Sequence, residues 1–129
     1  MNARRVLPRL LRRPRQTGPK WIDVHELHDQ LAGDRGLLLI DVRGPDEFNG
    51  SLGHIPGARN IPLGDLAGSV KEIGPSQRCR VTLVCRTDKR SAQAAAIFEQ
   101  EGFADVEVLR GGMEQWNRAG FEIVREASA

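Results

Sequence analysis

Residues 85–91, Cys-Arg-Thr-Asp-Lys-Arg-Ser, combine a nucleophilic side chain with three cations. The apolar run 81–84 precedes the cysteine, and an alanine-rich segment follows the loop. A cysteine that ends a buried strand and opens a tight loop before a helix is exposed to backbone N–H groups and to the positive end of the helix dipole. Both stabilise a thiolate, the nucleophilic form of cysteine. The segment therefore predicts that Cys85 is a nucleophile, and the alternative is a buried cysteine that packs as a small apolar side chain.

The size and composition of the chain indicate one globular domain. It has 129 residues, of which 40% are hydrophobic and 28% charged, enough for one packed core. No run approaches the roughly 18 apolar residues of a transmembrane helix, and no signal peptide is evident. Two cysteines, Cys79 and Cys85, are too few for a disulfide scaffold and lack the spacing of a zinc site. We expect a soluble, cytoplasmic protein with no transmembrane segment.

Charge is distributed unevenly along the chain. Residues 1–20 carry six arginines, one lysine and no acid, whereas residues 21–129 hold 12 basic and 17 acidic residues. Prolines interrupt the basic segment, so it has little capacity to form a helix. We predict a disordered basic arm at 1–20, a folded domain at 21–125 and a short tail at 126–129. There are two alternatives: the arm binds weakly to an acidic partner, nucleic acid or anionic lipid, or it is a transit peptide. No specific nucleic-acid recognition is expected.

Strand and helix patterns alternate from residue 21 onward. A continuous apolar run of strand length occurs at 37–42, and further strands are predicted at 59–61, 80–84 and 105–109. Helical patterns occur between Asp23 and Gly33, at 44–48, 63–73 and 91–101, and from 112 through Trp116. The alternation predicts an α/β fold, with a central parallel sheet of about five strands and helices on both faces. Ligands of such sheets bind beyond the carboxyl ends of the strands, which is where Cys85 falls.

Four segments, in this order along the chain, resemble the rhodanese homology domain. They are Leu-Ile-Asp-Val-Arg at 39–43, Gly-His-Ile-Pro-Gly-Ala at 53–58 with Asn-Ile-Pro at 60–62, the loop 85–91, and Leu-Arg-Gly-Gly-Met at 109–113 with Trp116. The resemblance covers about residues 21–125. It implies a rhodanese-like fold and a sulfurtransferase activity, in which Cys85 accepts a sulfane sulfur as a persulfide and passes it to a nucleophile.

The residues fit this chemistry. A Cys85 thiolate would attack the outer sulfur of an anionic donor such as thiosulfate, with sulfite leaving, and a thiol or cyanide would then attack the persulfide. Negative charge stays on sulfur throughout, so inward N–H groups stabilise every stage, and no cofactor is required. The expected partners are a small-molecule sulfur donor and a thiol or cyanide acceptor, or an acceptor protein.

The residues after Cys85 form the predicted substrate-binding loop: Arg86, Thr87, Asp88, Lys89, Arg90 and Ser91. Arg86 and Lys89 would attract an anionic donor, or else remain solvated loop charges, and Arg90 would also close the loop. Asp88 occupies a position where rhodanese-like loops often have glycine, and because Asp tolerates the left-handed region we expect that the loop can still close. Its carboxylate could pair with Lys89 or Arg86 and weaken the attraction of dianionic donors.

Three further residues are predicted to support the site. Asp41 and Arg43 share one face at the end of a strand, with Glu47 as a candidate partner for Arg43. They would pair with neighbouring loops or act in the site directly. His54 would orient the backbone by hydrogen bonding, and a proton shuttle is the alternative. No metal site is predicted, since the helical pair His25 and His28 lacks a third ligand.

Two other classes of function remain open. Phosphatases with a similar loop use a C-x5-R spacing that suits a phosphoryl group, whereas Cys85 and Arg90 have the spacing C-x4-R, which favours sulfur. The other alternative is a binding or sensing module without turnover. Cys79 is not expected to be a resolving cysteine, because the strand between the two cysteines would span about 20 Å.

Overall fold

The computed structural model describes residues 18–33, 36–73 and 79–125. The predictions for the basic arm, apart from residues 18–20, and for the tail at 126–129 concern residues outside this part. Five parallel strands form one sheet in the order β1-β5-β4-β2-β3. Their bounds are β1 Lys20–Ile22, β2 Leu37–Asp41, β3 Arg59–Asn60, β4 Arg80–Val84 and β5 Val106–Leu109.

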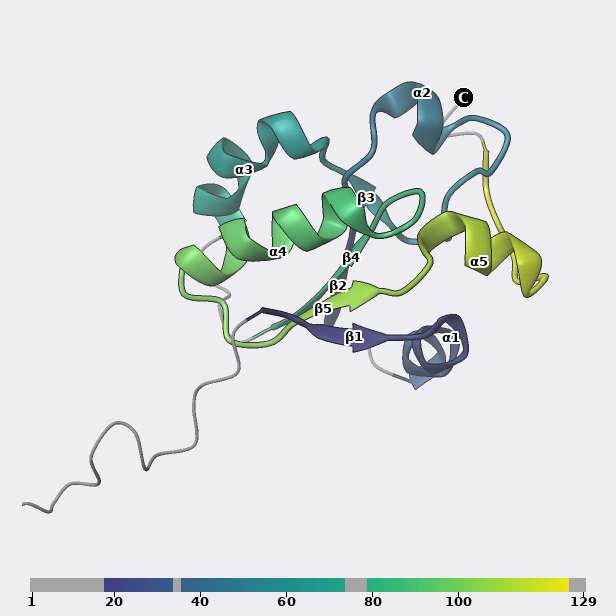
Figure 1. Cartoon of the computed structure of the whole chain (residues 1–129), viewed down its shortest axis with the longest axis horizontal. Coiled ribbons are helices and arrows are strands. Elements are labelled where there is room, and N and C mark those ends of the chain that lie inside the picture. The colour runs from purple at the N-terminus through teal and green to yellow at the C-terminus, as the bar shows by residue number, and fades with distance from the viewer. Residues whose placement is uncertain (1–17, 34–35, 74–78, 126–129) are drawn as a thin grey trace, which may run out of the picture.

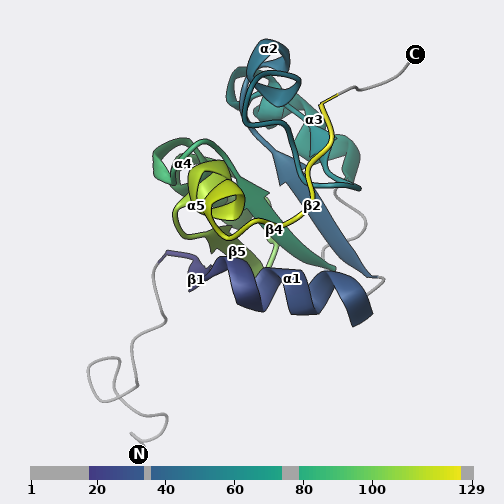
Figure 2. The same ribbon diagram turned by 90° about the vertical axis from the view of Figure 1, so that its right-hand side faces the viewer.

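Helices cover both faces of the sheet, as predicted (Figures 1 and 2). The helices α3 (Leu66–Ile73) and α4 (Lys89–Gln100) pack on one face, and α1 (Val24–Gly33) and α5 (Gly112–Arg118) contribute to the core of the other. The side chains of β4 alternate between the two cores: Val81 and Leu83 face α3 and α4, whereas Val84 faces α1 and α5. A strand covered on both sides is apolar at most of its positions, which explains the nearly continuous apolar runs.

The helices predicted after Asp23 and at 44–48 are present. Asp23 and Glu26 form a reciprocal capping box at the start of α1, in which the side chain of each accepts the backbone N–H of the other at 2.9 Å. The short helix α2 (Pro45–Phe48) follows β2 and reaches beyond the carboxyl end of the sheet (Figure 1). In the described ranges, no helix has the length and apolar character needed to cross a bilayer.

Three elements differ from the prediction. The edge strand β1 was not predicted, because three residues that pair only with β5 carry no recognisable pattern. The segment predicted as one helix at 63–73 begins as the 3-10 turn η2 (Leu63–Asp65) and continues as α3. Finally, α4 begins at Lys89 rather than at Ser91, so the reactive loop is shorter than expected.

Candidate active site

Cys85 lies at the carboxyl end of the central strand β4 and is 1% exposed. On the neighbouring strand, the backbone N–H of Val42 donates to the carbonyl oxygen of Val84 at 2.9 Å, just past the end of β2. The cysteine is therefore held by the sheet on one side, while the loop that follows it leads directly into α4. This is the edge at which open parallel sheets bind their ligands.

The start of α5 holds the loop from the outside. The backbone N–H of Met113 donates to the Cys85 carbonyl at 2.9 Å, and that of Glu114 donates to the Arg86 carbonyl at 3.0 Å. The C=O and N–H of a trans peptide point in opposite directions, so these outward carbonyls turn the N–H groups of Arg86 and Thr87 toward the inside of the loop. The predicted inward orientation of loop N–H groups therefore has a structural cause.

Gly112 is where the loop and α5 come closest. Its φ is +53°, and a Cβ atom at this position would overlap the carbonyl oxygens of Cys85 and Thr87 and lie 2.7 Å from that of Arg86. The preceding Gly111 also has a positive φ, of 80°. The glycine pair permits a tight turn into α5, and Gly112 additionally leaves room for the loop carbonyls.

Ser91, in the first turn of α4, contacts the sulfur of Cys85. The backbone N–H of Ser91 donates to Sγ at 3.4 Å, and its Oγ lies 3.2 Å from Sγ. Oγ is also 3.3 Å from the carbonyl oxygen of Asp88, so a hydroxyl that donates to the sulfur gives up that bond. Ser91 is fully buried, and the positive end of the α4 dipole acts at the same point. These groups suit a sulfur anion.

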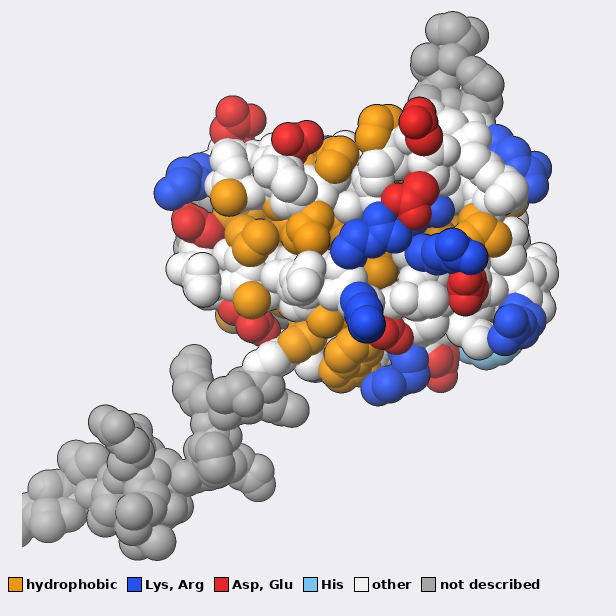
Figure 3. Space-filling model, turned by 45° about the horizontal axis from the view of Figure 1, so that its top comes forward, with side chains coloured by type: hydrophobic (Ala, Val, Ile, Leu, Met, Phe, Trp, Pro, Cys, Tyr) orange, Lys and Arg blue, Asp and Glu red, His pale blue; other side chains and the backbone are white. Residues whose placement is uncertain are grey.

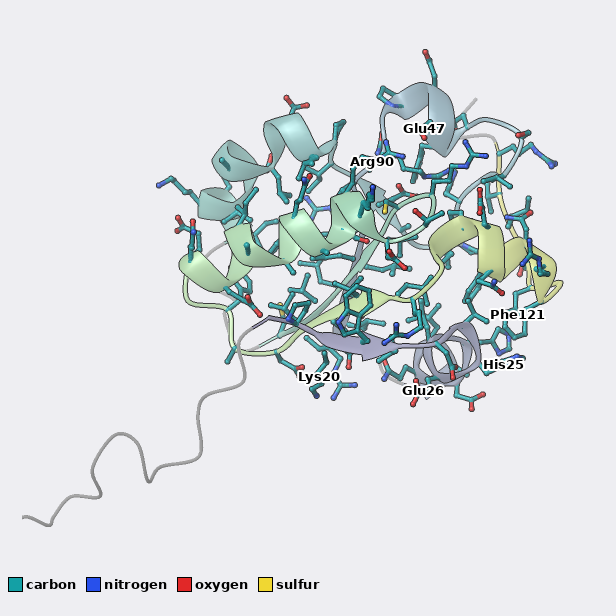
Figure 4. All side chains as sticks on the ribbon, viewed as in Figure 1. Lys20, His25, Glu26, Glu47, Arg90 and Phe121 are labelled. Atoms are coloured by element: carbon teal, nitrogen blue, oxygen red, sulfur yellow. The ribbon has the colours of Figure 1, made fainter. Side chains whose placement is uncertain are left out.

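Arg90 closes the loop through an ion pair with α2. Its two terminal nitrogens donate to the two carboxylate oxygens of Glu47 at 2.6 and 3.0 Å, and the side chains point toward one another in Figure 4. The hydrogen bonds from Arg90 lower the pKa of Glu47, although desolvation opposes them. In return, the bonds to Glu47 raise the pKa of Arg90, and negative charge on Cys85 raises it further. The predicted pairing of Glu47 with Arg43 is wrong, because Arg43 is bound elsewhere.

Asp41 and Arg43 form a buried pair next to the loop, and both side chains are 1% exposed. Arg43 donates to the two carboxylate oxygens at 2.9 and 2.7 Å and to the carbonyl oxygen of Gly53 at 2.6 Å. The amide of Asn60 donates to the carbonyl oxygens of both residues. The pair thus connects the end of β2 to the segment around Gly53. The two side chains lie on one face, as predicted.

Asp88 does not adopt the left-handed conformation considered above. Its φ is −155° and its ψ is −2°. One carboxylate oxygen accepts a hydrogen bond of 3.3 Å from the N–H of Gly111, so the side chain faces the turn before α5. The expected pairing of Asp88 with Arg86 is also wrong, because Arg86 Nε donates to Glu114 at 2.7 Å. Thr87 and Lys89 are exposed, and among the described residues no ion pair involves Lys89.

The three histidines have packing partners. His54 is buried, stacks on Phe48 with ring centres 3.6 Å apart, and has Nδ1 2.8 Å from the Phe48 carbonyl oxygen. Its backbone also exchanges two hydrogen bonds of 2.8 Å with Val124. The side chain therefore has the backbone-orienting contact predicted for it. His25 and His28 pack against Phe121, which Figure 4 shows beside His25.

A cavity of about 380 Å³ borders the loop. Its lining residues are Arg43, Asp46, Glu47, Gly50, Ser51, Leu52, Arg86 and Glu114. A larger cavity, of about 570 Å³, lies beside Cys79, and one of about 550 Å³ between α1 and α5 reaches the loop at Asp88. We assign the approach to Cys85 to the smaller cavity, because Arg86 is the next residue in the chain and Glu47 binds Arg90. Cys79 lies at the opposite end of β4 from Cys85.

Sequence reasoning missed Glu114, which contacts Arg86 through both its backbone and its side chain. The contact joins residues 28 positions apart, so no local pattern indicates it. The only available signal was its place in the first turn after the glycine pair, at the same edge of the sheet as the loop.

Comparison with known proteins gives the family. The model of the rhodanese-like domain matches residues 23–119, and the chain belongs to this family. It is 39% identical over 103 residues to a sulfurtransferase of Allochromatium vinosum, covering 80% of this chain and 92% of that protein. It is 44% identical over 85 residues to the uncharacterized protein YqhL of Bacillus subtilis, covering 66% of this chain and 64% of that protein.

Solved structures agree in fold. The rhodanese-like domain of an Anabaena protein matches with a TM-score of 0.72 and 27% identity, covering 86% of this chain and 83% of that one. A Rhodopseudomonas palustris protein described as a possible tyrosine phosphatase matches with a TM-score of 0.72 at 23% identity, covering 82% of this chain and 85% of that one. The likeness to the Rhodopseudomonas palustris protein shows only that the two share a fold. The relatives described as sulfurtransferases support a sulfurtransferase family.

Proposed function

We propose that the protein is a sulfurtransferase that carries a sulfane sulfur on Cys85. The observation that carries the proposal is the contact of the Cys85 sulfur with the N–H and hydroxyl of Ser91, at the start of α4. A sulfur that ends a buried strand and meets hydrogen-bond donors and a helix dipole is suited to be a thiolate nucleophile. The sulfurtransferase relatives support the same reaction class.

The reaction has two steps. The Cys85 thiolate attacks the outer sulfur of thiosulfate, a sulfur–sulfur bond forms, and sulfite leaves with the electrons of the broken bond. In the second step a thiolate or cyanide attacks the terminal sulfur of the persulfide and releases the Cys85 thiolate. Each species carries negative charge on sulfur inside the loop, where the N–H groups already point inward and need no reorganisation.

The remaining residues hold this geometry. Glu47 fixes Arg90, and the pair of Asp41 and Arg43 fixes the chain around Gly53. We place the activity in a reducing compartment such as the cytoplasm, because a thiolate nucleophile must stay reduced between turnovers. The acceptor is a small thiol, cyanide or a thiol on a partner protein.

Intact mass measurement tests the proposal. After incubation with thiosulfate and removal of excess donor, the protein gains one sulfur atom, and cyanide then removes it as thiocyanate. Cys85→Ser abolishes both events, whereas Cys79→Ser retains them, since Cys79 lies at the far end of β4. Loss in both folded variants, or in neither, would contradict the assignment of Cys85.

Two control reactions separate the alternative functions. Hydrolysis of an aryl phosphate without persulfide formation would indicate phosphatase chemistry, which the shorter C-x4-R loop disfavours. A folded protein that gains no sulfur from any donor would indicate a binding module instead.

A further inference from the structure

Three arginines beside the cavity that leads to Cys85 are paired with carboxylates. Arg43 binds Asp41 at 2.7 Å, Arg86 binds Glu114 at 2.7 Å, and Arg90 binds Glu47 at 2.6 Å. Figure 3 is consistent with this pairing. Over the right half of the face that it shows, blue and red side chains lie side by side and form no continuous blue patch. The loop is cationic in sequence, but its surroundings are close to neutral.

The carboxylates outnumber the arginines in the lining of this cavity. Asp46, Glu47 and Glu114 line it, against Arg43 and Arg86. Asp46 is exposed, and no ion pair involves it among the described residues. Outside the lining, Arg90 binds the lining residue Glu47, and Arg125 is bound to the Ser51 carbonyl oxygen at the rim. A dianion that enters the cavity therefore meets carboxylates as well as cations that already have partners.

Glu114 differs from the other carboxylates in this arrangement. The pair of Asp41 and Arg43 is buried, and Glu47 uses both oxygens on Arg90. Glu114 instead holds an exposed partner, since the Arg86 side chain is 61% exposed. Its backbone N–H also binds the Arg86 carbonyl, so the carboxylate stays beside the residue that follows the nucleophile. An anionic donor must compete with Glu114 for Arg86 and is repelled by the same charge.

Resting on the proposed sulfur transfer, we propose that Glu114 is a specificity-determining residue that disfavours dianionic donors. The site then accepts monoanionic or neutral sulfane-sulfur compounds, such as thiosulfonates and alkyl persulfides, in preference to thiosulfate. The Coulomb energy between Glu114 and a donor scales with the charge of the donor. Removing the charge of Glu114 should therefore change the logarithm of KM twice as much for a dianion as for a monoanion.

Two donors of similar size separate charge from chemistry. Thiosulfate is a dianion, and methanethiosulfonate replaces one of its oxygens by a methyl group and is a monoanion. The Cys85 thiolate takes the outer sulfur of either one, and the sulfur–sulfur bond breaks to release sulfite or methanesulfinate. We would measure KM and kcat for both, with cyanide as acceptor at low ionic strength, in the wild type, Glu114→Gln and Glu99→Gln. Glu99, exposed on α4 far from the loop, controls for the loss of one negative charge.

In Glu114→Gln we expect KM to fall about fourfold for thiosulfate and about twofold for methanethiosulfonate, the size of an exposed charge interaction of up to ~1 kcal/mol. Glu99→Gln should leave both values unchanged. KM for thiosulfate should depend weakly on salt in the wild type and rise with salt in Glu114→Gln, where an unpaired Arg86 attracts the anion.

Equal effects on the two donors, or a rise of KM for thiosulfate in Glu114→Gln, would overturn the proposal, since Glu114 would then only position Arg86. If Glu114→Gln does not fold, the salt dependence of the wild type still tests the proposal. A wild-type KM for thiosulfate that rises steeply with salt would indicate unneutralised cations and would contradict it. Absence of turnover with both donors in every variant would instead remove the proposed function.

Discussion

The close approach at Gly112 makes Gly112→Ala the most informative single substitution. The added Cβ would overlap the carbonyl oxygens of Cys85 and Thr87, which are backbone atoms and cannot rotate away. Relief requires α5 to move off the loop, and this movement breaks the hydrogen bonds that the N–H groups of Met113 and Glu114 make to the loop carbonyls. The matched control is Gly120→Ala, because Gly120 has a similarly left-handed φ of +81° but nothing within 4 Å of the added atom.

Both substitutions place alanine in the left-handed region, but only Gly112→Ala also breaks hydrogen bonds. Alanine in the left-handed region costs roughly 1–2 kcal/mol, and the reduced freedom of the unfolded chain returns about 0.4–1 kcal/mol. Gly112→Ala adds the loss of two hydrogen bonds at about 1 kcal/mol each, apart from the overlap itself. We therefore expect Gly112→Ala to be destabilised by at least ~2 kcal/mol more than Gly120→Ala, which is roughly 8 °C in melting temperature at about 4 °C per kcal/mol.

Urea and thermal unfolding measure this difference, and the alkylation rate of Cys85 measures its effect on the site. In Gly112→Ala under native conditions the alkylation rate should change, because the loop N–H groups lose their fixed direction, whereas in Gly120→Ala it should match the wild type. Equal losses of stability in the two variants would refute the argument that the loop is held by its contact with α5.

Three further predictions concern the surroundings of the loop. Glu47→Gln should lower the melting temperature at pH 7, and this difference should shrink as the pH falls. Arg90 lowers the pKa of Glu47, so the pair stabilises the fold above the unfolded value of about 4.3, and this contribution is lost as the pH falls through the folded value. A difference that persists at low pH would point to packing instead. Gly68→Ala should raise stability by about 0.5–1 kcal/mol in urea unfolding, because Gly68 lies within α3 and its added Cβ meets nothing within 4 Å. Destabilisation there would show that α3 needs this glycine. Ser91→Ala should slow iodoacetamide alkylation of Cys85 several-fold at neutral pH, since a thiolate loses one donor; an unchanged rate would mean that the hydroxyl bonds only to the Asp88 carbonyl.

The sequence predicts the features that depend on local patterns. The strands β2 and β4 are recognisable because a strand buried on both faces is apolar at most positions. The place of Cys85 follows from the end of such a strand and the start of a helix. The four motifs of the rhodanese-like family supply the topology, which the family model and the sheet order bear out.

The pairing of charged side chains could not be predicted in the same way. Arg90 and Glu47 are 43 positions apart, and Arg86 and Glu114 are 28 apart, so only the folded chain determines which cation meets which carboxylate. The choice of Arg43 as the partner of Glu47 was wrong for this reason. The pairing of Asp88 with Arg86 was wrong for the same reason, because Arg86 binds Glu114 and Asp88 accepts from the N–H of Gly111, both from another part of the chain.

The contact between the loop and α5 also affects the order in which the protein matures. During synthesis, Cys85 emerges from the ribosome before residues 111–114, whose backbone receives and orients the loop carbonyls. A nascent chain that ends at Leu109 has the sheet residues and the cysteine but lacks the groups that fix the loop. The nucleophilicity that we propose for Cys85 therefore requires that α5 has been made and has docked, and the alkylation rate of Cys85 would report that the domain is complete.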